Sequence, residues 1–101
     1  MLKKLQEKFA DASTAYAAKH AIDRDPDWYI LKLQEEVGEQ TQAWNNATGR
    51  DRNRQASKEE LRRAIADETA DIFGHVLLFA HRNDIDLVSA IERKWKFRPG
   101  L

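Results

Sequence analysis

No cysteine occurs in the sequence, so disulfide bonds and thiolate metal sites are both excluded. No apolar run approaches the ~20 residues that a membrane-spanning helix needs. The opening residues, MLKKLQEKFADAS, lack the apolar core and the cleavage site of a signal peptide. A surplus of charge is missing too, because 17 basic residues balance 17 acidic ones, so no global field attracts nucleic acid. These absences predict a protein with no membrane partner and a cytoplasmic address, for which nucleic acid is not an expected ligand.

The length of 101 residues is enough for one domain and too short for two, so a single domain over residues 1–101 is expected. Hydrophobic residues make up 42% and charged residues 34% of the chain, a composition typical of soluble helical proteins rather than of disordered ones. A monomer of this size covers its apolar surface poorly. Association with a second copy is therefore expected.

The hydrophobic pattern predicts an all-α fold, since apolar residues recur at steps of three and four and nowhere alternate with period two. Asp25, followed by proline, is a predicted N-cap, and Ser57 with Glu60 forms a capping box. Asp84 or Asp86 is expected to cap the last helix. The four predicted helices cover residues 2–21, 26–44, 57–81 and 87–95, with a loop at 45–56 and with Pro99 and Gly100 after the last helix.

Three carboxylates crowd one arc of the second predicted helix. At about 100° per residue, Glu35, Glu36 and Glu39 share an arc roughly 100° wide. Trp28 and Leu31 lie beside this arc. An apolar surface on two sides of one helix predicts packing both within the subunit and across an oligomer interface. The opposite apolar side consists of Ile30, Leu33, Val37 and Trp44.

The third predicted helix places two further acids near these three. Glu68 falls in the middle of an apolar stripe, and Asp71 lies beside it, so both can converge on one point. An unpaired buried carboxylate costs several kcal/mol, so a cation is required there. The apolar stripes of the first three helices offer no inward basic residue to match five acids. Oxygen-only ligands favour Mg²⁺, with Mn²⁺ as a substitute, over zinc.

EEVGE at residues 35–39 and ETAD at residues 68–71 read as EExxE followed by ExxD. This pair resembles the signature of the MazG-like all-α nucleoside triphosphate pyrophosphohydrolases, a superfamily that includes dimeric dUTPases and phosphoribosyl-ATP pyrophosphohydrolases. The segment NDIDLVSAIERKW is similar to the one that follows ExxD in these proteins. The resemblance covers most of the chain, from about Trp28 to Arg98, and the gap between the motifs is near the upper end of the family's range.

The resemblance implies a four-helix MazG-like bundle that assembles as a homodimer or a homotetramer, with sites completed across subunits. It implies Mg²⁺-dependent hydrolysis of a nucleoside triphosphate between its α- and β-phosphates, which gives a nucleoside monophosphate and pyrophosphate. Since acids cannot bind a triphosphate directly, the metal would bridge them and neutralise the charge that develops at phosphorus. Glu36 or Glu39 would be catalytic and would orient or deprotonate the water. The implied metal ligands are Glu35, Glu36, Glu39, Glu68 and Asp71.

The residues that would bind the substrate carry weaker signals. By resemblance, Asn83 and Lys94 would face the nucleotide or its phosphates. Lys96 and Arg98 extend this basic group, whose charges suit phosphate. Trp28 lies on the carboxylate side and would contact the substrate, although tryptophans more often anchor a core or an interface. A second basic set in the predicted loop consists of Arg50, Arg52 and Arg54.

Alternatives to this enzyme remain open. A non-catalytic helical oligomerisation or regulatory module would keep the metal for structural reasons. A basic C-terminal strip that docks on DNA or RNA is a third reading, although the neutral charge of the chain argues against it. Within the enzyme reading, the nucleotide could be a non-canonical one removed from the pool or a deoxynucleotide whose level is controlled. Phosphoribosyl-ATP is less favoured, because nothing in the sequence connects the chain with histidine synthesis.

Overall fold

The structure is a computed structural model that describes residues 1–50 and 56–101. It contains α1 (Leu2–Lys19), α2 (Trp28–Ala47), α3 (Lys58–Arg82) and α4 (Leu87–Trp95). The predicted all-α class is confirmed, because the described residues form four helices and no strand. Over the same residues, none of the helices is both long and apolar enough to cross a membrane.

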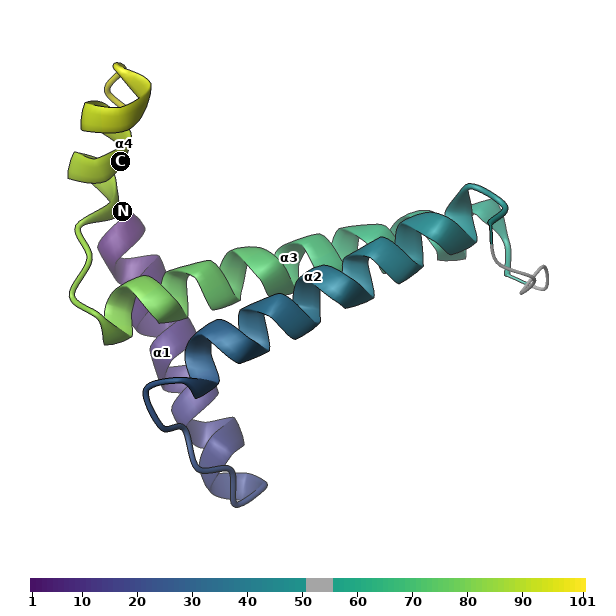
Figure 1. Cartoon of the computed structure of the whole chain (residues 1–101), viewed down its shortest axis with the longest axis horizontal. Helices are drawn as coiled ribbons and strands as arrows, with labels where there is room; N and C mark the ends of the chain where they lie inside the picture. The colour runs from purple at the N-terminus through teal and green to yellow at the C-terminus, as the bar shows by residue number, and fades with distance from the viewer. Residues whose placement is uncertain (51–55) are drawn as a thin grey trace.

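Helices α2 and α3 form an antiparallel hairpin, and α3 also contacts α1 (Figure 1). Helix α1 crosses the hairpin near the end at which α2 begins and α3 ends. Helix α4 extends away from the hairpin, and the two chain termini lie near each other. The four helices therefore do not close into a bundle within one copy of the chain.

The starts of α3 and α4 carry the predicted side-chain caps. Ser57 Oγ accepts a hydrogen bond from the Glu60 backbone N–H at 3.1 Å, which is the N-cap half of a capping box, and the Ser57 hydroxyl also donates to Glu60 Oε1 at 3.1 Å. Of the two predicted caps for α4, Asp86 is the one that acts, since its carboxylate accepts from the Ser89 N–H at 3.1 Å. The hydrogen bonds from Ser89 lower the pKa of Asp86.

Three helix ends differ from the predicted ones. Helix α1 stops at Lys19, because Ala21 has a left-handed backbone with φ 52°. Helix α2 begins at Trp28, two residues later than predicted. Asp25 Oδ1 accepts a hydrogen bond from the Trp28 N–H at 2.9 Å, which holds the preceding residues in a turn. Helix α2 then continues to Ala47, so the first residues of the predicted loop are helical.

Helices α1 and α3 approach each other closely at Gly74. This glycine is buried, and a Cβ added to it would lie 2.6 Å from a ring carbon of Phe9 on α1. The Phe9 ring also packs edge-on against Phe73, with ring centroids 6.4 Å apart. Leu77, one turn further along α3, is the most completely buried large side chain. The crossing of α1 over the hairpin thus depends on the absence of a side chain at Gly74.

Substituting Gly74→Ala is expected to lower the free energy of unfolding by about 1–2 kcal/mol, because the Phe9 ring must move to admit the methyl group. Gly38→Ala is the matched control, since Gly38 is also helical and has nothing within 4 Å of an added Cβ. Helix propensity alone should make that variant more stable by about 0.5–1 kcal/mol. Urea titrations measure both changes. Equal changes at the two glycines would contradict the close approach.

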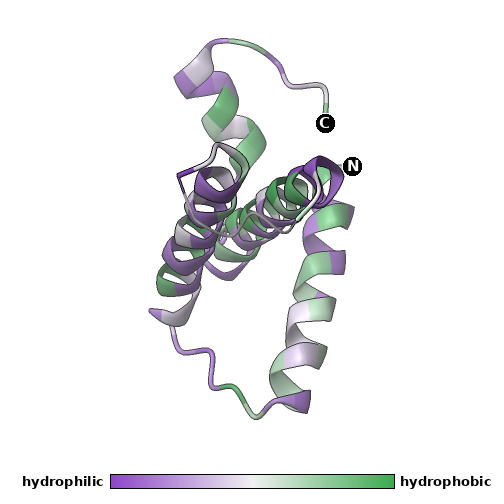
Figure 2. Cartoon of the chain, turned by 90° about the vertical axis from the view of Figure 1, so that its right-hand side faces the viewer, coloured by the Kyte–Doolittle hydropathy of each residue, from purple (hydrophilic) through white to green (hydrophobic). Residues whose placement is uncertain are grey.

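The chain is more open than a compact domain of its length. The Cα radius of gyration is 16.0 Å, whereas about 13 Å is expected. The accessible surface is 8007 Å², against about 5,900 Å² for a folded monomer of this mass. No residue of α4 is buried, and Figure 2 shows hydrophobic residues along α1 and on α4. Much apolar surface therefore stays uncovered in a single copy.

Candidate metal centre

Helices α2 and α3 bring three glutamates together. Glu36 and Glu39 lie three residues apart on one side of α2, and Glu68 approaches them from α3. One carboxylate oxygen of each glutamate lies within 4.8 Å of the other two. We call these three residues the carboxylate cluster. The cluster joins the EExxE and ExxD segments, which the antiparallel hairpin places side by side.

Two oxygens of the carboxylate cluster are buried without a partner. Glu36 is 6% exposed and is the one charged residue that is fully buried in the described part of the chain. Glu36 Oε2 and Glu68 Oε2 accept no hydrogen bond from the protein. Both atoms are also buried from water. Leaving a carboxylate oxygen in this state costs free energy, which a proton or a cation recovers. The two atoms are therefore suited to a positively charged ligand.

The pKa values of the clustered glutamates point in the same direction. Burial, followed by the hydrogen bond and the charge of Glu39, raises the pKa of Glu36 to about 7. Burial, followed by the charges of Glu39 and Asp71, raises the pKa of Glu68 above its ordinary value. In the absence of a cation, Glu36 and Glu68 thus hold protons more tightly than exposed glutamates do.

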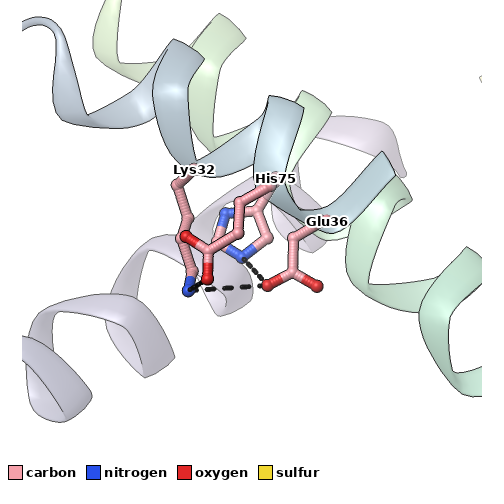
Figure 3. A network of polar contacts seen from close by, with 4 residues as sticks. Lys32, Glu36 and His75 are labelled. Atoms are coloured by element: carbon pink, nitrogen blue, oxygen red, sulfur yellow. Dashed lines mark hydrogen bonds and ion pairs between the residues drawn. The ribbon is translucent and has the colours of Figure 1, made fainter. Parts of the chain in front are cut away.

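Lys32 is a basic residue at the edge of the carboxylate cluster (Figure 3). Its Nζ lies 3.5 Å from Glu35 Oε1 and 3.6 Å from Glu36 Oε1. Burial alone would lower the pKa of Lys32, but attraction by Glu35 and Glu36 outweighs burial and raises it. The expectation of no inward basic residue overlooked this lysine, although the i,i+4 spacing of Lys32 and Glu36 is a sequence signal for such a pair. A single lysine still leaves the three clustered glutamates with an excess of negative charge.

His75 on α3 borders the carboxylate cluster without adding a second cation. Its Nε2 lies 3.9 Å from Glu36 Oε1 (Figure 3), and burial followed by repulsion from Lys32 lowers its pKa. The imidazole is therefore neutral at pH 7. The ring of Trp28 packs edge-on against His75, with ring centroids 6.1 Å apart. Trp28 thus lies next to the residues that border the carboxylate cluster.

The two remaining acids of the predicted metal set lie outside the carboxylate cluster. Glu35 is exposed and pairs with Lys32. Its carboxylate and that of Glu36 both contact the Lys32 ammonium, at 3.5 Å and 3.6 Å. Asp71 is also exposed, but its charge contributes to the raised pKa values of Glu36 and Glu68. Asp71 is thus within electrostatic reach of the cluster, and Glu35 is held at its edge.

The predicted substrate residues near the C-terminus do not reach the carboxylate cluster within one copy. Asn83 is the C-cap of α3, and its Nδ2 donates to the Phe79 carbonyl at 2.8 Å. Lys94, Lys96 and Arg98 are exposed on α4 and the segment after it, which extend away from the hairpin (Figure 1). These basic side chains could meet a substrate at the cluster only through another position of α4 or through a second copy.

The structure describes one of the three arginines that form the second predicted basic set. Arg50 is exposed, and its Nη1 donates to Thr48 Oγ1 at 3.0 Å. Arg52 and Arg54 lie outside the described residues. The set therefore adds no observed contact to the carboxylate cluster.

The carboxylate cluster could hold a metal ion. Its ligands would all be oxygens, and they are mounted on two packed helices. Hard divalent cations such as Mg²⁺ and Mn²⁺ prefer such ligands. A bound cation would satisfy the two unpaired oxygens, Glu36 Oε2 and Glu68 Oε2, and would favour the ionised form of both residues. The residues present thus fit a divalent ion, whose identity the ligand types alone do not fix.

Comparison with known proteins gives no family assignment. No protein-family model, no curated protein and no solved structure matches the chain. Over the residues that the structure describes, the protein is all-α with four helices, and α2 and α3 carry a three-glutamate cluster that could hold a metal ion.

Proposed function

We propose that this chain is a Mg²⁺-dependent nucleoside triphosphate pyrophosphohydrolase of the MazG-like superfamily, which releases a nucleoside monophosphate and pyrophosphate. The proposal is carried by one observation. The EExxE and ExxD segments, distant in the sequence, meet in a carboxylate cluster that contains two buried oxygens without donors. A solvated helix face would leave no such oxygens, because water would reach them.

A divalent cation explains how an acidic site can act on an anionic substrate. Glu36, Glu39 and Glu68 would hold Mg²⁺, or Mn²⁺ in its place. When bound, the ion would offset the negative charge of the phosphates and would stabilise the charge that develops at phosphorus. Nucleoside triphosphates, canonical or modified and with a deoxyribose as the favoured sugar, are the substrates that the proposal names.

Two glutamates are suited to take the proton of the attacking water. Glu39 is exposed, so it can meet a water that enters from solvent. Glu36 is buried within the cluster, and a bound cation would keep it ionised, which is the form that accepts a proton. The remaining member of the cluster, Glu68, would serve the metal alone.

The proposal assigns the substrate to the side of the carboxylate cluster that Trp28 borders. A partly exposed indole next to a metal site offers a flat surface to a nucleobase. Phosphate would be held by Lys94, Lys96 and Arg98 of a second copy, with Asn83 as a polar contact. Because these groups are solvent-exposed on an extended arm, they are available to another subunit.

A homodimer or homotetramer is part of the proposal. Ile30, Val37 and Trp44 recur every seven residues on α2, and they are 47%, 37% and 53% exposed. A stripe of this kind in a soluble helix is typical of an interface. The accessible surface exceeds that of a folded monomer by about 2,100 Å², which is the scale of obligate interfaces.

The test of the proposal is an assay of pyrophosphate release. Purified protein is incubated with canonical and modified nucleoside and deoxynucleoside triphosphates, with Mg²⁺ or with EDTA, while light scattering reports the molar mass. We expect Mg²⁺-dependent formation of monophosphate and pyrophosphate from at least one substrate.

The alternative is a non-catalytic helical oligomerisation or regulatory module with a structural metal site. The open shape and the exposed α2 stripe are the observations that favour it. This alternative is favoured if the protein binds Mg²⁺ and forms stable oligomers but hydrolyses none of the nucleotides in the panel.

A further inference from the structure

A cleft distinct from the carboxylate cluster lies where α1, the connection between α1 and α2, and the end of α3 meet. Its volume is about 290 Å³. None of its lining residues is acidic. We call it the arginine cleft. Its polar lining consists of Thr14, Arg24, Tyr29, His81 and Arg82.

Two guanidinium groups converge in the arginine cleft on the buried ring of Tyr29. The Cζ atoms of Arg24 and Arg82 lie 5.8 Å and 5.7 Å from the ring centroid. These distances are within the range of cation–π contacts, which help to hold both side chains in place. Two positive charges are therefore fixed in one small cleft.

The partners of these two arginines in the described part of the chain are neutral. Arg24 donates from Nη1 to Ser13 Oγ at 2.9 Å and from Nη2 to Thr14 Oγ1 at 3.1 Å. Neither arginine forms an ion pair with a described carboxylate. Since a guanidinium has five N–H donors, Arg24 keeps further donors for a ligand. No described carboxylate therefore forms a direct ion pair with the two arginines of the cleft.

The arginine cleft is separate from the carboxylate cluster. Tyr29 precedes Glu36 by seven residues on α2, and His75, which borders the cluster, precedes Arg82 by seven residues on α3. Two helical turns correspond to about 10 Å. The same seam of the hairpin therefore carries an acidic site and, two turns away, a basic one.

We propose that the arginine cleft binds a phosphate group, either of free phosphate or of a nucleotide. Planar guanidinium groups present paired N–H donors that match the oxygens of phosphate, and two of them supply the charge that a dianion needs. The cleft has the volume of roughly ten liquid waters, which accommodates a phosphate group. The inference is independent of the proposed function, because it involves neither the metal nor the carboxylate cluster.

The test is a calorimetric titration of the metal-free protein in EDTA and a phosphate-free buffer. Inorganic phosphate and a nucleoside monophosphate are the two probes. Saturable binding of one equivalent is expected for at least one of them. Tighter binding of the monophosphate identifies a nucleotide phosphate as the ligand, and equal or tighter binding of inorganic phosphate identifies the free ion. Absence of saturable binding by both probes overturns the inference.

Arg82→Gln is the informative variant, because Arg82 is exposed and its loss is compatible with folding, which circular dichroism checks. Removing one charged donor is expected to weaken phosphate binding at least about tenfold. Arg63→Gln is the matched control, since Arg63 lies on the same helix in an exposed pair with Glu59. Glu36→Gln should keep phosphate binding, which separates this site from the metal centre. Equal affinities of Arg82→Gln and the unaltered protein overturn the inference.

Discussion

Glu36→Gln is expected to weaken Mg²⁺ binding more than about 100-fold and to reduce pyrophosphate release to background. Loss of a group that only supports a metal ligand already costs about 10–100-fold in affinity. Glu36 is itself in the carboxylate cluster, and its Oε2 is buried without a donor. Glutamine has almost the same shape but no charge, so it cannot balance a divalent cation. Calorimetry with Mg²⁺ and Mn²⁺ measures the affinity, and the pyrophosphate assay measures turnover.

The matched control for this substitution is Glu35→Gln, because the same chemical change is then made one residue away on the same helix. Glu35 is exposed, pairs with Lys32 and lies outside the carboxylate cluster. We expect its substitution to change Mg²⁺ affinity less than about threefold, the effect of a partly screened charge. Equal losses of affinity in the two variants would show that the three-glutamate geometry does not describe the metal site. Retained affinity in both would place the metal elsewhere.

The metal-free protein is expected to lose stability as the pH rises from about 5 to about 7.5. The pKa of Glu36 is raised from 4.5 to about 7 in the folded chain, and that of Glu68 is raised as well. A group whose pKa is raised by folding stabilises the fold fully below its unfolded pKa, and this contribution disappears as the pH passes its folded pKa. Each pKa unit is worth about 1.4 kcal/mol, so after screening by nearby water we expect a loss of about 1–2 kcal/mol.

The lowered pKa of His75 changes the stability with pH in the direction opposite to that of the two glutamates. Its pKa is lowered by burial, so it destabilises the fold when the pH falls below its ordinary value of 6.5. Urea unfolding of Glu36→Gln beside the unaltered protein, from pH 5 to pH 8 in EDTA, separates the two contributions. The free energy of unfolding should decrease less between pH 5 and pH 7.5 in the variant than in the unaltered protein. Saturating Mg²⁺ should also make this decrease smaller, because the cation replaces the protons. An unchanged decrease in the variant would contradict the raised pKa of Glu36.

The helices and their caps were predictable where the determining contacts are local. Ser57 accepts from the Glu60 N–H within one turn, and Asp86 caps α4 in the same way, so sequence alone located both starts. The start of α2 was misplaced because Asp25 holds Trp28 in a turn rather than capping a helix. The connection that contains this turn is also bonded to α1, through Arg24 to Ser13 and Thr14.

The residues of the carboxylate cluster were predictable in part, because positions along one helix are also a local property. Helical periodicity places Glu36 and Glu39 on one side of α2, and the half-buried position of Glu68 follows from its apolar neighbours. Periodicity could not show which of the neighbours Glu35 and Glu36 faces α3. That depends on how α2 is rotated about its axis, and one residue corresponds to about 100°. Lys32 was overlooked although its i,i+4 spacing with Glu36 indicates such a pair, because only the apolar stripes of the helices were considered for basic residues.

The sequence by itself determined the all-α class, the four helices and the presence of acids that cannot be buried alone, because spacing along a helix and the cost of uncompensated charge are local properties. Only the tertiary structure decided which three carboxylates converge, that Lys32 and His75 border them, and that Arg24 and Arg82 meet over Tyr29. These contacts join segments that are far apart in the chain. Their geometry depends on the rotation of each helix about its axis and on the close approach at Gly74, which only packing fixes.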